Sequence, residues 1–406
     1  MNTPRTPPTS IPIWFICITA SLGLAVAMGV GRFAFTPLLP LMQREGLIDG
    51  TAGAWLASAN YVGYFLGALT AAYLPGKTRI QVMLSLLATV VFTMGMTALT
   101  HLAGWIMLRL LAGIVSAWAL ILISGWSMTA LALRKRSDAG GWVFAGVGIG
   151  IALAGGWVWW QNDVDALSLW TQLGWLSLGL TIIIVVLWPD ASTAALPNRH
   201  VPVDALIHYP APVHRHSKAL VLCYGALGFG YILPATYLPT LAQGLIDDPR
   251  QFGLLWPIFG LAAAVSTLLA GRALRHWKGR NIWAASHLTL ATGCALPLFS
   301  HSGWAIMLAA IFVGGTFLVA TMTGLQEARH MMPTNPKPLL ARMTAAFALG
   351  QIAGPLVALM FNHVPVPALH LSGLELAQAL AALLLLISAR WLYHSQQKSE
   401  QAGDCH

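Results

Sequence analysis

The feature that most constrains this chain is a succession of apolar stretches, each about as long as a helix that crosses a lipid bilayer. The stretches are continuous rather than alternating, which favours helices over the strands of a membrane barrel. Transmembrane spans are predicted near residues 13–42, 51–74, 80–101, 104–133, 141–162, 170–188, 219–243, 251–272, 281–300, 303–325, 339–361 and 371–393. The sequence therefore predicts an all-α membrane protein of twelve transmembrane helices.

Composition leads to the same fold class. Of the 406 residues, 57% are hydrophobic and only 9% are charged, whereas ordinary soluble domains carry roughly 25% charged residues. A water-soluble fold of this length could not hide so much apolar surface. The net charge of +9 lies in short loops between apolar runs, so it indicates membrane topology, with the lipid bilayer as partner and no nucleic acid.

The distribution of positive residues predicts the orientation. With the N-terminus inside, 18 of the 22 Lys and Arg residues fall on cytoplasmic segments, and only Arg44 and Arg250 fall on outer ones. Positive residues concentrate on the cytoplasmic side of membrane proteins, so both termini are predicted to be cytoplasmic. We expect a multi-pass protein of the bacterial inner (cytoplasmic) membrane.

One long polar segment, 189–218, divides the chain into two sets of six spans. The predicted domains are an N-terminal six-helix bundle at 1–188, a cytoplasmic linker at 189–218, and a C-terminal six-helix bundle with a short cytoplasmic tail at 219–406. The linker holds four histidines, but no metal-ligand spacing recurs among them, and proline-rich polar segments are usually linkers. The four cysteines form no paired motif, so no metal, cofactor or disulfide is expected.

The two halves contain an internal repeat. The first span includes the run Gly29 to Pro40, GVGRFAFTPLLP, and the seventh includes Gly228 to Pro239, GFGYILPATYLP. At an offset of 199 residues both glycines, one leucine and the final proline coincide, and Trp105 falls on Trp304. Two six-helix halves in the same orientation fit a parallel repeat, because an even number of spans returns the chain to its starting side.

This pattern resembles the major facilitator superfamily, and the run from Gly29 to Pro40 resembles its YbfB/YjiJ-like branch. Arg109 with Gly113 resembles the superfamily's Arg-x-x-x-Gly element. Ala71 stands where the superfamily usually has an acid, which weakens the expectation of the usual gating ion pair. The resemblance implies two pseudo-symmetric six-helix bundles whose spans 1, 4, 7 and 10 line a central cavity.

Glycines are concentrated in the predicted fifth and eleventh spans. The fifth resembles the glycine-rich helix of many antiporters, although its Gly-Pro pair appears instead as Gly354-Pro355 in the eleventh. Small residues let helices approach closely in membranes. We expect these glycines, with Gly350 beside Gln351, to pack the two halves together.

Two arginines, Arg32 and Arg109, lie inside apolar spans, with no Asp or Glu at comparable depth. A buried arginine needs a partner or a wet cavity, and its planar guanidinium can hold a carboxylate or phosphate by two parallel bonds. An anion-binding cavity is one interpretation. Alternatively, Arg109 snorkels to the outer surface, and Arg32 binds carbonyls left free by Pro37 and Pro40.

The candidate substrate-binding residues are Arg32, Arg109, Tyr231, Thr36 and Tyr237. Tyr231 is the counterpart of Arg32 in the second half. For energy coupling, protons are one option, through His101, His287 or His301. The acid of the twelfth span, Glu375, is interpreted as a helix-end residue rather than a proton relay.

The working hypothesis is a monomeric secondary transporter that moves a small-molecule substrate, an organic anion, by alternating access. The alternative within this class is an efflux carrier for amphipathic neutral or cationic compounds, which the glycine-rich fifth span favours. An intramembrane enzyme or a receptor is a further alternative. No His-Glu-x-x-His, Gly-x-Ser-x-Gly or phosphate-loop motif occurs, so no enzymatic activity is expected.

Overall fold

The structure is a computed structural model that describes residues 12–161, 163–188, 211–243, 253–332, 336–363 and 372–403. All regular elements in these ranges are helices. The first half contains α1 (Ile13–Leu24), η1 (Ala25–Val30), α2 (Phe35–Arg44), α3 (Gly50–Thr70), η2 (Ala71–Tyr73), α4 (Thr78–Ala98), α5 (Leu102–Leu133), η3 (Ser137–Ala139), α6 (Gly140–Trp160) and α7 (Ala166–Leu187). The second half contains α8 (Ala211–Gln243), α10 (Leu255–Ala273), α11 (Gly279–Phe299), α12 (Gly303–Met331), α13 (Lys337–His363) and α14 (Gly373–Gly403).

These helices coincide with the predicted spans, with α1, η1 and α2 together forming the first. Within the described ranges, eleven helical segments are long and apolar enough to cross a membrane. The remaining predicted span is α3, which is 21 residues long but contains four glycines with Ser58 and Asn60. Its small and polar residues fit its position, because one face of α3 packs closely against α5 and α13.

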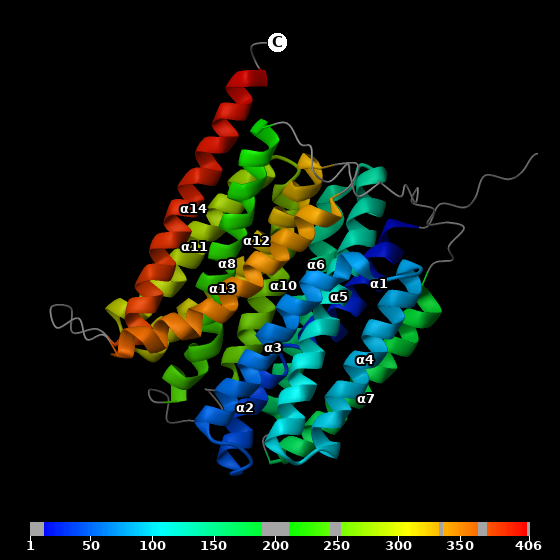
Figure 1. The fold of residues 1–406 in the computed structure, drawn as a ribbon, viewed down its shortest axis with the longest axis vertical. Coiled ribbons are helices and arrows are strands. Elements are labelled where there is room, and N and C mark those ends of the chain that lie inside the picture. The colour runs from blue at the N-terminus through cyan, green and yellow to red at the C-terminus, as the bar shows by residue number, and fades with distance from the viewer. Residues whose placement is uncertain are drawn as a thin grey trace, which may run out of the picture.

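The helices form two groups that follow the order of the chain. Figure 1 shows the blue-to-green helices α1–α7 on one side and the green-to-red helices α8–α14 on the other. The two groups meet where α6 packs against α10 and α3 packs against α13. Helix α1 begins and α14 ends on the same face of the molecule (Figure 1), which we call the terminal face. The predicted linker lies largely outside the described residues, although α8 already begins at Ala211.

Glycines set the distance between α6 and α10. A Cβ on Gly148 would lie 2.4 Å from the backbone nitrogen of Ala264, and a Cβ on Gly260 would lie 2.4 Å from that of Ala152. No side chain fits at either position, so the fifth-span glycines pack the halves together as expected. The prediction for the eleventh span was wrong for Gly350, which faces Gly225 of α8 within its own half.

The first span is interrupted in its second half. Pro37 has no N–H, and Thr36 donates its backbone N–H to Phe33 at 3.2 Å, one residue short of the α-helical pattern. The carbonyl of Arg32 therefore lacks its usual backbone donor. A six-residue π-helical stretch, η1, lies just before this break. The break places Arg32 in a turn between η1 and α2, and Thr36 in the first turn of α2.

Polar caps mark some of the helices that begin opposite the terminal face. Asp49 accepts a hydrogen bond from Ala52 at the start of α3, and Asp165 accepts one from Ser168 at the start of α7. Such caps satisfy orphan N–H groups of the first helical turn. The hydrogen bonds from Ser168 also hold the pKa of Asp165 below its ordinary value. At the terminal face, α4 and α11 instead begin after Lys77 and Lys278.

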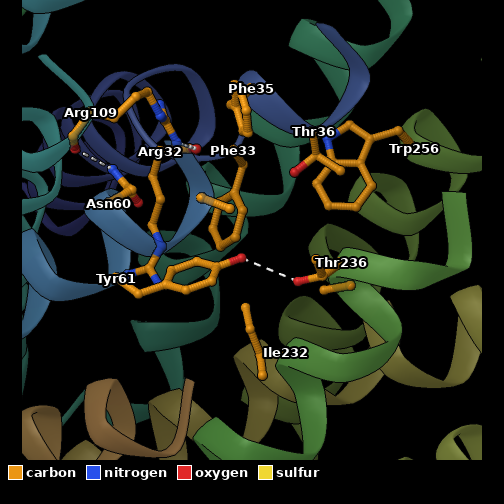
Figure 2. A pocket seen from close by; sticks show the side chains of 12 residues that line it. Arg32, Phe33, Phe35, Thr36, Asn60, Tyr61, Arg109, Ile232, Thr236 and Trp256 are labelled. Carbon is orange, nitrogen blue, oxygen red and sulfur yellow. Dashed lines mark hydrogen bonds between the residues drawn. The ribbon is translucent and has the colours of Figure 1, made fainter. Parts of the chain in front are cut away.

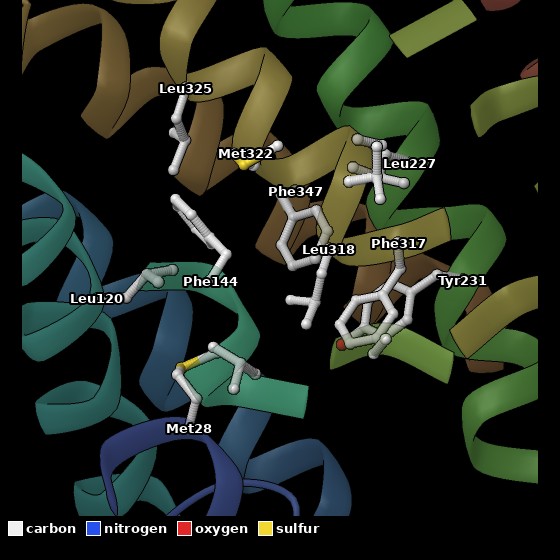
Figure 3. Close-up of a cluster of buried hydrophobic side chains, with 14 of the residues drawn as sticks. Met28, Leu120, Phe144, Leu227, Tyr231, Phe317, Leu318, Met322, Leu325 and Phe347 are labelled. Atoms are coloured by element: carbon white, nitrogen blue, oxygen red, sulfur yellow. The ribbon is translucent and has the colours of Figure 1, made fainter. Parts of the chain in front are cut away.

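An apolar layer joins the two halves. It is one continuous cluster of buried side chains that draws on helices of both halves. Figure 3 shows residues of the first half facing residues of the second across this layer: Met28, Leu120, Phe144, Leu318, Leu325 and Phe347. Because close-packed apolar side chains exclude water, this layer separates the polar site described next from the terminal face.

Candidate functional site

A small cavity lies between the two halves, nearer the face opposite the terminal face. Its volume is about 20 Å³, which is room for about one water molecule, so a larger ligand requires the two halves to move apart. The polar side chains of its lining are Arg32, Thr36, Asn60, Tyr61, Arg109 and Thr236, and its aromatic walls are Phe33, Phe35 and Trp256. Figure 2 shows these side chains converging from both halves.

Arg32 lies at the centre of the contacts between the halves. It is 3% exposed, and its guanidinium carbon lies 3.8 Å from the centre of the Tyr64 ring, a cation–π distance. Its Nη2 donates a hydrogen bond to Oε1 of Gln351 on α13. The amide nitrogen of Gln351 in turn donates to the hydroxyl of Tyr231 on α8. A buried cation of the first half is thus held by uncharged groups.

The charge of Arg32 is not neutralised by any carboxylate among the described residues. Its Nε and Nη1 are buried and have no hydrogen-bond partner in the described structure. Besides Gln351, the guanidinium contacts the rings of Phe33, Tyr61 and Tyr64, which stabilise a cation without neutralising its charge. Two donor nitrogens of a fixed positive charge are therefore available to an anion.

Arg109 has a different role. Its Nη1 donates to the carbonyl of Gly31 at 3.3 Å, and its Nη2 donates to the carbonyl of Arg32 at 3.1 Å. It therefore binds carbonyls exposed by the break in the first span, the role that the sequence suggested for Arg32. Its guanidinium is 4.7 Å from the centre of the Phe35 ring, and its side chain is 4% exposed, so the snorkelling alternative was wrong. Only its Nε is unpaired in the described structure.

A second polar contact crosses the cavity. The hydroxyl of Tyr61 on α3 lies 3.2 Å from the hydroxyl of Thr236 on α8, within hydrogen-bond distance (Figure 2). Thr36 lines the same cavity. The structure thus brings together Arg32, Arg109 and Thr36, and joins Tyr231 to them through Gln351. The side chain of Tyr237 lies outside the described residues.

Several further residues of this region were not predicted from the sequence, among them Asn60, Tyr61, Thr236, Trp256 and Gln351. Each is uncharged and of a type common in membrane helices, so only its position distinguishes it. Gln351 was noted in the sequence because it stands beside Gly350, but the hydrogen bond between Gln351 and Arg32 was not predicted.

Two of the three histidines considered for proton coupling, His287 and His301, are held in structural contacts. The indole of Trp283 donates to Nε2 of His287 at 2.8 Å, so that nitrogen is an acceptor and carries no proton. The other ring nitrogen lies 2.9 Å from the hydroxyl of Ser388, which fixes a neutral imidazole. Glu375 accepts bonds from the backbone N–H and the hydroxyl of Ser372 and from His301. With Ser372 at the N-cap, this is a capping box.

Polar contacts between the halves also gather near the terminal face. Asp138 accepts hydrogen bonds from Arg275 of the second half at 2.8 and 3.0 Å. Arg329, at the end of α12, donates to the carbonyls of Ser124 and Gly125 on α5 at 3.0 and 2.9 Å. The absence of an acid at position 71 therefore does not leave this face without an ion pair. The ion pair is formed instead by Asp138 and Arg275, which lie outside the loop of Ala71.

A helical membrane protein of two six-helix halves, with a polar cavity between them, is a transporter of the major facilitator type. The profile of the family described as "Uncharacterised MFS-type transporter YbfB" matches residues 24–392. The chain belongs to this family, as the run from Gly29 to Pro40 suggested. No curated protein matches the chain.

Proposed function

We propose that this transporter moves a small organic anion across the bacterial inner membrane by alternating access, with Arg32 as the residue that binds the charge. The observation that carries the proposal is a buried guanidinium with two unpaired donor nitrogens and no carboxylate partner in the described structure. An arginine at this depth is costly unless it is functional or paired. Its bond to Gln351 connects it to the second half, so a bound anion can affect both halves.

The contacts between the halves support alternating access. The bonds of Arg329 and Asp138 close the terminal face, while the cavity lies on the opposite side of the apolar layer. Opening the terminal face requires these bonds to break and the halves to rock apart. The excess of Lys and Arg on the loops of this face supports its assignment as cytoplasmic, so the present conformation is closed toward the cytoplasm.

A cationic substrate is disfavoured by the same charges. The cavity is lined by two arginines and, among the described residues, by no acidic side chain, so a cation entering it meets uncompensated repulsion at low dielectric. A neutral substrate would leave the Arg32 N–H groups without an anionic acceptor. We therefore do not propose efflux of neutral or cationic compounds, and the experiment below distinguishes it from anion transport.

The test is counterflow of radiolabelled carboxylates in proteoliposomes. We expect wild-type protein to exchange at least one carboxylate, Arg32→Gln to abolish exchange, and Arg32→Lys to retain part of it, because lysine keeps the charge but not the planar donor pair. Arg342→Gln, on the exposed surface of α13, is the matched control and keeps the wild-type rate. Exchange of neutral or cationic compounds that is insensitive to Arg32→Gln would contradict the proposal.

A further inference from the structure

The cavity contains two unmatched polar atoms besides those of the arginines. The side-chain oxygen of Asn60 and the indole nitrogen of Trp256 are buried and have no hydrogen-bond partner in the described structure. Their residues are 0% and 5% exposed, and both line the cavity. A buried polar atom without a partner is costly, so each marks a place where a ligand can supply the missing bond.

Asn60 requires a donor close to the anionic end of the ligand. Its amide nitrogen donates to the backbone carbonyl of Arg109 at 3.0 Å, which fixes the amide beside the arginines (Figure 2). Its remaining atom is an oxygen, which only accepts hydrogen bonds. A plain carboxylate at Arg32 offers acceptors alone and leaves Asn60 unmatched.

Trp256 requires an acceptor farther away, on the second half. Its ring stacks on Phe259 with centroids 4.9 Å apart and lies 6.4 Å from the ring of Phe33. Figure 2 shows it facing Phe33 and Thr36 across the cavity, on the side away from Asn60. An indole N–H is a donor only, so the matching ligand atom is an oxygen on the part of the molecule remote from Arg32.

From these atoms we infer that the substrate is a hydroxylated carboxylate: the carboxylate binds Arg32, a hydroxyl near it donates to Asn60, and a distal oxygen accepts from Trp256. This inference rests on the proposed anion transport and specifies its substrate class. A hydroxyl is both donor and acceptor, so a chain bearing hydroxyls can satisfy both unmatched atoms. The aromatic walls of Phe33 and Tyr61 suit the carbon chain between them.

The test uses three six-carbon monoanions that differ only in a hydroxyl: hexanoate, 2-hydroxyhexanoate and 6-hydroxyhexanoate. Their dissociation constants are measured by calorimetry on the purified full-length protein. We expect each hydroxy acid to bind at least about tenfold more tightly than hexanoate, because a site built to pair a hydroxyl discriminates against its absence. Equal affinities for all three anions would overturn the inference.

Two variants test which side chain is responsible for the preference for each hydroxy acid. Trp256→Phe removes the indole N–H, and the preference for 6-hydroxyhexanoate over hexanoate falls toward one. Asn60→Ala does the same for 2-hydroxyhexanoate. The matched control is Trp170→Phe, which removes another buried, unpartnered indole N–H of α7 that is not part of the cavity lining; both preferences remain at the wild-type value. Preferences that persist in Trp256→Phe and fall in Trp170→Phe would overturn the assignment.

The outcomes separate this inference from the proposed function. If hexanoate binds as tightly as the hydroxy acids and Arg32→Gln abolishes binding, the hydroxyl inference fails and anion transport stands. If wild-type protein binds no carboxylate and exchanges none in proteoliposomes, both fail. If Asn60→Ala does not fold, Trp256→Phe alone decides the distal contact, because phenylalanine preserves the stacking on Phe259.

Discussion

Arg32 and Tyr231, which occupy equivalent positions in the two halves of the repeat, are joined through the amide of Gln351. The oxygen of Gln351 accepts from Arg32 and its nitrogen donates to Tyr231. Tyr231 is itself stacked between Phe317 and Phe347, with centroids 5.1 and 5.3 Å away. The flexible arginine is thus held by a rigid aromatic stack of the opposite half, and movement of one half changes the position of the charge.

Replacing Gln351 by glutamate tests whether the free charge of Arg32 is what binds substrate. The carboxylate of Gln351→Glu would pair with Arg32 and compete with the anion, so we expect carboxylate affinity to fall at least about tenfold, equivalent to about 1.4 kcal/mol. Gln351→Met removes the hydrogen bonds without adding charge and is expected to cause a smaller loss. Equal effects of the two variants on dissociation constants would contradict the prediction.

Arg109 is expected to matter more for stability than Arg32. Replacing it by methionine leaves the carbonyls of Gly31 and Arg32 unbonded, at a cost of roughly 1–3 kcal/mol for each buried group. Arg32→Met removes a cation that already has two unpaired donor nitrogens and is expected to cost less. Thermal unfolding in detergent compares the two. A lower midpoint for Arg32→Met than for Arg109→Met would show that the roles are reversed.

The close contact of α6 with α10 predicts a strong effect of a single side chain. A Cβ at position 148 would lie only 2.4 Å from the backbone nitrogen of Ala264, and Gly148→Val adds two methyl groups to it. The two halves must therefore separate, and their interface is lost. We expect little correctly folded protein on size-exclusion chromatography and no transport. The matched control is Gly156→Ala on the same helix, where a Cβ meets nothing within 4 Å; it is expected to behave as wild type.

The helices were predictable because hydropathy alone decides which segments can enter a bilayer, and every predicted span contains a helix in the described residues. The arginines were predictable for the same reason, since a charge in an apolar span is rare. The different roles of Arg32 and Arg109 were not predictable from the sequence. Which arginine binds the free carbonyls depends on how α5 lies beside the break at Pro37, and no pattern within either segment contains that geometry.

The remaining site residues depend on contacts between distant segments. Gln351 is one of several buried glutamines, and only its hydrogen bond to Arg32 of the first span distinguishes it from Gln378. Gly350 was assigned to the wrong neighbour because a small residue favours close approach without specifying a partner. The pair of Asp138 with Arg275 joins loops 137 residues apart. A pattern within one segment of the sequence cannot identify such pairs.

Opening of the terminal face is expected to depend on Arg329 more than on Arg275. Arg329 makes three hydrogen bonds to α5 from a largely buried position, and bonds from a charged donor contribute roughly 1.5–3 kcal/mol. Arg275 is 56% exposed, and exposed ion pairs contribute about 0–1 kcal/mol. Arg329→Leu is therefore expected to increase the population open at this face severalfold, and Arg275→Gln to increase it slightly.

Spin labels on Leu133→Cys and Trp277→Cys, exposed residues of the two halves near the terminal face, report this opening as a longer interspin distance. Arg280→Gln is the matched control, because Arg280 pairs with Glu327 within the second half and its loss leaves the contacts between the halves intact. Because the proposed alternating access requires this face to open, Arg329→Leu is also expected to change the rate of counterflow. An unchanged distance distribution in Arg329→Leu, or a shift of equal size in Arg280→Gln, would show that the apolar layer alone holds this face closed.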